Sequence, residues 1–163
     1  MIARIMTATA TLKRSWASDL DTAALYDLLK LRFEVFVLDQ KALVQDLDDI
    51  DLLIETRHLW LQEDGRMIAY LRLSEEYDDG VKSYRISRVC TAVAQRGRGH
   101  TTRLLRAALA EVGSAACWIN AQTYLVDMYA KHGYKVDGEE FQEGGIPHVL
   151  MRRGGGKPWT EST

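Results

Sequence analysis

Residues 84–112 read YRISRVCTAVAQRGRGHTTRLLRAALAEV, and this stretch decides the fold. Its first part, Tyr84 to Val93, is rich in β-branched residues and predicts a strand. Its last part, from about Thr101 to Val112, repeats leucine and alanine at helical spacing and predicts an amphipathic helix. Between them lies the short segment Gln95–His100, which carries two glycines and two arginines. The stretch therefore predicts a strand that passes through a small-residue loop into a helix.

Residues 96–102 have the chemistry of an anion site. The first N–H groups of a helix lack intrahelical partners, and the helix dipole adds about half a positive charge there. Gly97 and Gly99 let a phosphate approach the backbone closely. Arg96 and Arg98 add full charges that suit a pyrophosphate. A surface loop that merely carries glycines and arginines is the alternative interpretation.

The spacing of this loop excludes two other phosphate-binding motifs. A Walker A loop requires a Gly-Lys-Ser/Thr run, which does not follow. The dinucleotide fingerprint requires a third glycine, and Thr102 stands in its place.

Two motifs in the right order resemble those of a known family. Arg96-x-x-Gly99-x-Thr101 is similar to the R/Q-x-x-G-x-G/A signature of the GNAT acetyltransferases, and Tyr129–Tyr134 is similar to their Y-x-x-x-G-F/Y element. Thr101 departs from the usual Gly or Ala, so its hydroxyl can donate to a phosphate or its bulk can crowd one. Smaller matches in order, over roughly Leu25 to Arg152, resemble the ElaA-like subgroup.

The resemblance implies an α/β fold in one GNAT domain, residues 1–153. Its central mixed sheet is mostly antiparallel, is splayed between two parallel strands and is flanked by helices. A β-bulge in the strand Tyr84–Val93 would open a V-shaped gap toward the strand Cys117–Gln122. The glycine-rich end, residues 154–163, predicts a flexible tail.

Local patterns predict the remaining elements. Helices are expected over Thr22–Val37, capped by Asp19 or Asp21, and over Leu125–His132. The further strands are predicted at His58–Gln62, Met67–Glu75, Tyr134–Phe141 and His148–Arg152.

The resemblance further implies acetyl-CoA (CoA) as the cofactor. Its pantetheine arm would pair with the backbone of Val89 and Thr91 in the V-shaped gap, as an added strand does. Its pyrophosphate would rest on the N–H groups of residues 97–102. The implied cofactor-binding residues are Val89, Cys90, Thr91, Arg96, Gly97, Arg98, Gly99, His100, Thr101, Thr102 and Gln122.

The implied activity is N-acetyltransfer to a primary amine by direct attack on the thioester. Tyr129 is the candidate acid for the departing thiolate, with a core tyrosine as the alternative. A backbone N–H near Val89–Thr91 would stabilise the oxyanion. His148 is the candidate base because histidine titrates near neutral pH, with a hydrogen bond inside the sheet as the alternative. Glu75 acting through a water chain is another candidate base.

The acidic run Asp46, Asp48, Asp49 and Asp51 points to a cationic acceptor, since clustered carboxylates attract an amine. The predicted substrate-binding residues are Glu34, Asp46, Asp48 and Arg88. A solvated loop is the alternative, because most charge runs are solvated. Asp46-x-Asp48 begins like an EF-hand loop, but Ile50 and a missing glycine break the pattern, so no metal is predicted.

Composition limits the partners. The chain has 163 residues, with 21 basic and 23 acidic side chains, and lacks the basic excess of a nucleic-acid-binding protein. No apolar run approaches the ~20 residues of a membrane span, and Met1–Leu12 lacks the plan of a secretory signal. The two cysteines, Cys90 and Cys117, predict reduced, buried thiols and a cytoplasmic protein.

The predicted partner is thus a small-molecule amine, with neither nucleic acid nor a membrane involved and with a monomer or a homodimer both open. Two alternative functions stay open. One is a non-catalytic acyl-CoA-binding module, which the Thr101 departure favours. The other is an acetyltransferase for protein lysines or N-termini.

Overall fold

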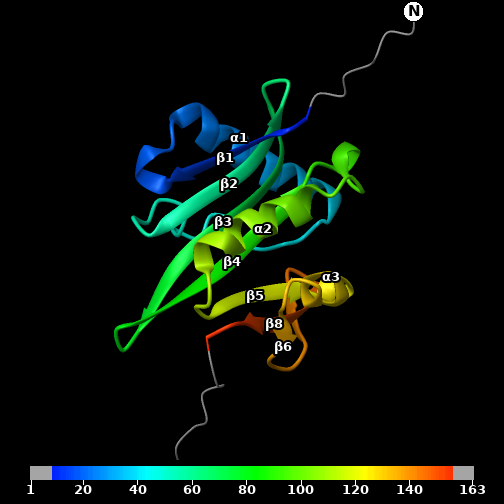
Figure 1. The fold of residues 1–163 in the computed structure, drawn as a ribbon. Coiled ribbons are helices and arrows are strands. Elements are labelled where there is room, and N and C mark those ends of the chain that lie inside the picture. Colours follow the sequence, from blue (N-terminus) through cyan, green and yellow to red (C-terminus); the bar gives the residue numbers. More distant parts are fainter. Residues whose placement is uncertain (1–8, 156–163) are drawn as a thin grey trace, which may run out of the picture.

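The computed structural model describes residues 9–155, and Figure 1 shows one twisted sheet with α1 on one face and α2 on the other. The strands are β1 (Thr11–Trp16), β2 (Thr56–Glu63), β3 (Arg66–Asp78), β4 (Val81–Thr91), β5 (Cys117–Gln122), β6 (Lys135–Val136), β7 (Phe141–Glu143) and β8 (Ile146–Arg153). The helices are α1 (Thr22–Arg32), α2 (His100–Val112) and α3 (Val126–Ala130). Short 3-10 turns cover Ala17–Asp19, Val93–Gln95 and Thr123–Leu125, and η2 (Phe33–Asp39) is a π-helix.

The sheet opens between β4 and β5. Its order is β1-β2-β3-β4-β5-β8-β6, with β7 paired to β8, and β4–β5 is the parallel pair among antiparallel neighbours. These two strands pair only at Tyr84↔Cys117 and Arg85↔Trp118, although both continue further. In Figure 1 the β5–β8–β6 group diverges from the β1–β4 group along this line. The predicted mixed, splayed sheet is confirmed.

A β-bulge in β4 accompanies the opening. Tyr70 pairs with Cys90 and Arg72 with Ser87, so Arg88 and Val89 together stand opposite Leu71. Arg88 has φ +56°, a left-handed conformation that is uncommon for a residue other than glycine and that occurs in one type of β-bulge. The predicted bulge is confirmed, and it leaves the backbone beside Val89 without a regular register partner.

The first helix starts at the predicted residue, but α1 ends at Arg32 and the π-helix η2 continues the helical segment to Asp39, two residues past the predicted end. The Asp21 carboxylate accepts a hydrogen bond from the Ala24 N–H at 2.7 Å and caps α1, one of the two predicted caps. Leu28, Leu31 and Val35 are buried against Trp60 and neighbours on the sheet. The chain then continues through η2, in which Gln40 N–H donates to Val35 O across five residues. A π-helix is wider than an α-helix, and such segments occur often at functional sites.

The opposite face of the sheet carries the larger core. Leu104, Leu105 and Ala108 of α2 are fully buried against strand residues that include Leu71 and Ile86. The leucine spacing of α2 predicted this buried stripe, and packing of an amphipathic face supplies most of a helix's stability. Helix α2 packs across β2, β3 and β4, and the Thr91–Thr101 contact holds its N-terminus beside the end of β4.

Several local predictions differ from the structure. β1 was not predicted, because the exposed edge strand TLKRSW lacks a clear apolar alternation. The continuous strand predicted over 134–141 is wrong: within that range only Lys135–Val136 and Phe141, the first residue of β7, pair with β8. A tight turn at Gly144 and Gly145, both with positive φ, joins β7 to β8. Two glycines at that turn favour the type I′ hairpin.

The termini and cysteines complete the description. Gly155 N–H donates to Ser114 O, and residues 156–163 of the predicted tail lie outside the described residues, as do residues 1–8. Cys90 and Cys117 are free and buried, as predicted. Among the helices of residues 9–155, none combines the length and the apolar character needed to cross a membrane.

Candidate active site

The loop before α2 presents backbone to open space. Gly97 and Gly99 have φ +76° and +77°, and an added Cβ at either would meet no atom within 4 Å. Gly99 is the N-cap of α2 and supplies no side chain to the first N–H groups of the helix. Those N–H groups therefore remain available to an anion, at the positive end of the helix dipole.

A cavity of about 380 Å³ lies above this loop and at the end of β4. All but one of the predicted cofactor-binding residues line it. The exception is Arg98, whose Nη1 donates to Gln95 Oε1 at 3.3 Å. The predicted residues that line the cavity are Val89, Cys90, Thr91, Arg96, Gly97, Gly99, His100, Thr101, Thr102 and Gln122.

The side chain of Thr101 is held at one wall of the cavity. Its Oγ1 lies 3.2 Å from Thr91 Oγ1, so the two hydroxyls form a hydrogen bond between α2 and β4. The hydroxyl that replaces the family's usual small residue is thus engaged with the strand. Nearby, Arg96 pairs with Asp39 at 2.9 Å in an exposed ion pair, which is weak and can exchange for a ligand anion.

The donor set of this cavity fits a diphosphate. Free helix N–H groups, Arg96 and two glycines without steric obstruction all favour a polyanion. His100 adds a buried Nε2 that has no hydrogen-bond partner within residues 9–155. A buried polar atom without a partner is costly, and it marks a position that a ligand can satisfy.

A second cavity, of about 730 Å³, lies on the α1 side of the sheet and joins the first. Five residues line both: Gln40, Val89, Gln122, Leu125 and Tyr129. The Gln122 side-chain amide donates to Gln40 Oε1 at 3.0 Å, which ties β5 to the end of η2. The bulged strand, the strand beyond the gap and the start of the Tyr129 helix thus meet where the two cavities meet.

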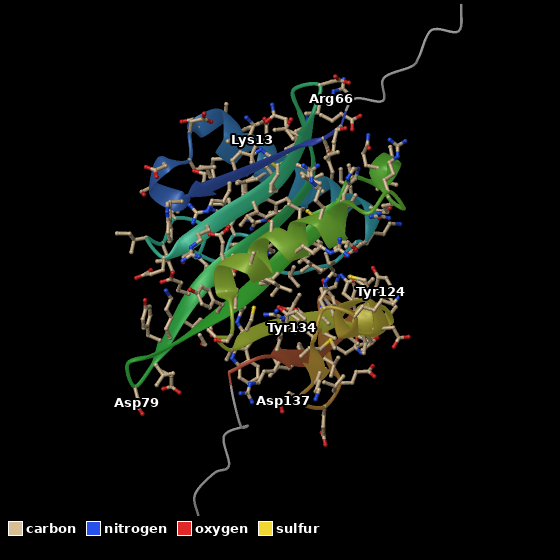
Figure 2. All side chains as sticks on the ribbon, viewed as in Figure 1. Lys13, Arg66, Asp79, Tyr124, Tyr134 and Asp137 are labelled. Atoms are coloured by element: carbon tan, nitrogen blue, oxygen red, sulfur yellow. The ribbon has the colours of Figure 1, made fainter. Side chains whose placement is uncertain are left out.

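Tyr129 is placed at that junction. Its side chain is 3% exposed and packs edge-on against Tyr134, which lies in the core (Figure 2). Its hydroxyl has no hydrogen-bond partner in the described part of the chain, although the residue lines both cavities. Burial raises the pKa of Tyr129 well above its usual value, so the phenol stays protonated.

His148 lies in the second cavity with a fixed ring. Its Nδ1 is 2.7 Å from the Ile146 carbonyl oxygen, so Nδ1 carries the proton and donates it to that acceptor. Phe141 stacks on the imidazole at 5.8 Å between ring centroids. In the neutral ring the lone pair is therefore on Nε2, which lies 3.6 Å from Glu143 Oε2.

The acidic run does not present free carboxylates. Arg32 from α1 contacts Asp46 at 3.0 Å and Asp51 at 2.6 Å. Arg72 from β3 contacts Asp51 at 2.9 Å and both carboxylate oxygens of Asp48. Arg88, at the bulge, contacts Asp46 and Asp48.

These contacts form a compensated network, here called the arginine–aspartate cluster: Arg32, Arg72, Arg88, Asp46, Asp48 and Asp51. Burial alone would raise the pKa values of Asp48 and Asp51, but the arginines overcome it and lower both. Three positive charges thus meet three negative charges. Asp46, Asp48 and Arg88 all line the second cavity, as part of a cluster whose formal charges balance, so a role for the two carboxylates in attracting an amine stays a prediction.

Two other predicted residues lie away from both cavities. Glu34 is exposed on η2 and lines neither cavity. Glu75, the alternative base, forms ion pairs with Arg57 and Lys82 and also lines neither. No group of three or more potential metal ligands occurs in the part of the chain that the structure describes.

Sequence reasoning missed several lining residues. Tyr124 projects from the turn before α3 and is 69% exposed where it lines the first cavity (Figure 2). Gln40, which lines both cavities, and Arg72, which lines the second, also carried no signal that marked them in the sequence. The sequence does carry one signal for Glu143. It directly precedes the Gly144-Gly145 turn, and a hairpin turn at these glycines places Glu143 and His148 near the same end of the hairpin.

Comparison with known proteins identifies the family. The family model described as acetyltransferase (GNAT) domain matches residues 26–154. The chain belongs to the GNAT acetyltransferase family. Within it, a UPF0039 protein of Mycobacterium tuberculosis is 56% identical over 148 residues, covering 90% of this chain and 95% of the relative.

Solved structures place this GNAT chain in the ElaA-like subgroup. The crystal structure of Escherichia coli ElaA has a TM-score of 0.80 at 30% identity, covering 89% of this chain and 99% of the other. An acyl-CoA N-acyltransferase of Pseudomonas aeruginosa has a TM-score of 0.79 at 36% identity, covering 88% and 99%. The GNAT fold and these neighbours support acyltransferase activity.

Proposed function

We propose that this protein transfers an acetyl group from acetyl-CoA to the nitrogen of a primary amine by direct attack. One observation carries the proposal: the first cavity, at the start of α2, and the second cavity share Val89 and Tyr129 among their lining residues. A thioester held from the first cavity and an amine held in the second would therefore meet beside a protonated phenol.

The first cavity would hold the cofactor. The N–H groups at the start of α2, with Arg96 and His100, would bind the diphosphate. The backbone at Val89 and Thr91 would pair with the pantetheine arm, because β4 and β5 leave that edge open. When bound, acetyl-CoA supplies an activated carbonyl group at the junction.

His148 would act as the base. Its Nδ1–H is committed to the Ile146 carbonyl, so Nε2 is the atom that can accept a proton from the amine. Tyr129 would act as the acid. Its phenol can donate a hydrogen bond to the departing sulfur; because burial raises its pKa, the proton itself would pass only as full thiolate charge develops on that sulfur.

The protons and electrons of the step balance. From the ammonium form of the acceptor, one proton leaves through His148 to solvent. The nitrogen lone pair forms the bond to the carbonyl carbon, and the carbon–sulfur bond breaks with its electron pair on sulfur. A second proton ends on that sulfur through Tyr129, and the amide keeps the third.

The two cysteines do not favour a covalent acyl-enzyme route. Burial raises the pKa of Cys90 to about 12, and burial also raises that of Cys117. Since the thiolate is the nucleophilic form, neither thiol is activated. This supports direct attack by the amine.

The test combines binding with turnover. Acetyl-CoA at 100 times its Kd should stabilise the fold by about 2.7 kcal/mol, visible as a rise in Tm. Free thiol should then appear when a panel of primary amines is added with acetyl-CoA. Binding without thiol release would favour the non-catalytic acyl-CoA-binding module, and release only with peptides would favour a protein acetyltransferase.

A further inference from the structure

The second cavity contains one carboxylate that the arginine–aspartate cluster does not neutralise. Of the carboxylates in residues 9–155 that line it, Asp46 and Asp48 each contact arginines, whereas Glu143 has no arginine partner. The nearby cations are committed, since Arg85 pairs with Glu76. Glu143 is thus the lining carboxylate left to act on a cation.

We propose that Glu143 binds the ammonium group of the acceptor and presents it to Nε2 of His148. This assignment rests on the proposed function and deepens it. The acceptor class is a primary amine that is cationic in solution, recognised through its nitrogen by the β7–β8 hairpin and not by the acidic loop.

The hairpin sets the distance between the two groups. Glu143 pairs in register with Ile146, and Ile146 is the residue whose carbonyl holds the His148 ring. Glu143 Oε2 and His148 Nε2 are 3.6 Å apart, too far for a direct hydrogen bond. A single nitrogen at about 2.9 Å from each atom would contact both.

The hairpin is also braced. A Cβ at Gly144 would lie 2.7 Å from Val44 Cγ1, so the turn packs directly against the loop that forms another wall of the cavity. Phe141, at the other end of β7, stacks on the His148 ring. These contacts fix the backbone of Glu143 before the ligand arrives. Binding then costs less conformational entropy, which favours recognition.

The charge chemistry favours an ammonium over a neutral acceptor. A hydrogen bond between an ammonium and a carboxylate is charge-assisted and roughly twice as strong as a neutral one. The Glu143 side chain is 44% exposed, so solvent screens part of the attraction. The expected contribution is therefore about tenfold in affinity, a modest value for an ion pair.

The test uses hexylamine as the probe and the CoA-saturated protein, in which no acyl group can be transferred. Calorimetry should show that Glu143→Gln weakens hexylamine binding about tenfold and leaves the Kd of CoA unchanged. The matched control is Glu140→Gln, because Glu140 is exposed on the same segment and lines neither cavity. Hexanol is the neutral control, and its weak binding should be equal in all three proteins.

In turnover, Glu143→Gln should raise the KM for hexylamine about tenfold with little change in kcat, and Tm should be unchanged. Equal hexylamine affinity in the wild type and Glu143→Gln, or binding to neither, would overturn the assignment. Failure of the proposed function would look different: CoA would not bind, or no thiol would be released. In that case hexylamine titration of the CoA-free protein would still decide whether Glu143 binds an ammonium.

Discussion

Replacing Asp51 with Asn tests whether the arginine–aspartate cluster holds the acidic loop in place. The Asp51 side chain is 9% exposed, and its Oδ1 accepts from Arg32 Nη1 at 2.6 Å and from Arg72 Nη1 at 2.9 Å. Arg32 itself is fully buried. The substitution keeps the shape and the acceptor oxygen but removes the negative charge between two buried guanidinium groups.

The expected loss of stability follows from this burial. Removing one partner of a buried ion pair costs about 3–5 kcal/mol, because the opposite charge is left uncompensated. The amide still accepts hydrogen bonds, so the lower end, about 3 kcal/mol, is expected. For a chain of this size that corresponds to a Tm decrease of about 6–12 °C. Urea unfolding followed by circular dichroism gives the free energy directly.

The same comparison has a predictable pH dependence. The pKa of Asp51 is lowered in the folded state, so its charge stabilises the protein above the unfolded value of about 3.9. This stability is lost as the pH falls through the lower, folded pKa. The difference between wild type and Asp51→Asn should therefore be constant above about pH 5 and shrink below about pH 4.

Asp49→Asn is the matched control. Asp49 is exposed in the same loop and has φ +66°, a conformation that asparagine tolerates. It makes no ion pair with any of the described residues. A Tm for Asp51→Asn within about 2 °C of this control would refute the claim that the cluster holds the loop.

Three further substitutions test the site. Tyr129→Phe should lower kcat about 100-fold, which is the lower end of the effect of removing a general acid. Calorimetry should show an unchanged affinity for acetyl-CoA. Equal losses of kcat and affinity would contradict the acid role. His148→Gln should lower the rate of thiol release by a similar factor, and raising the pH should restore much of it because the amine then loses its proton without a base. Gly99→Ala should weaken CoA binding and, because its φ is positive, cost about 1–2 kcal/mol of stability. Gly65→Ala is the control: Gly65 has a similar φ in a hairpin turn, so this variant should lose stability without losing CoA affinity. If both glycine variants bind CoA as the wild type does, the loop is not the diphosphate site.

Much of the fold could be predicted because its signals are local. The strand, loop and helix of residues 84–112 are set by β-branched residues, two glycines and a leucine stripe, all contiguous in the chain. β5 was predicted at its observed bounds, because its short apolar run has clear flanking signals. The splay of the sheet and the bulge came from resemblance to the family.

Weak local signals explain the missed elements. β1 is mostly polar and is exposed at the sheet edge, so partner strands and not its own pattern define it. The π-helix η2 continues an α-helical pattern, and its extra width arises where the chain meets the second cavity. Neither feature has a periodicity that distinguishes it in the sequence.

For the site, the sequence by itself was enough to predict a loop suited to an anion and to name candidate residues for proton transfer, since spacing along one chain segment carries both signals. Only the tertiary structure decided which charges are free. Asp46, Asp48 and Asp51 look like an open acidic run until α1, β3 and β4 bring arginines to them from positions up to 42 residues away. Ion pairing depends on distances of a few ångströms between segments that are remote in sequence, so no local pattern can reveal that these carboxylates are neutralised while Glu143 is not.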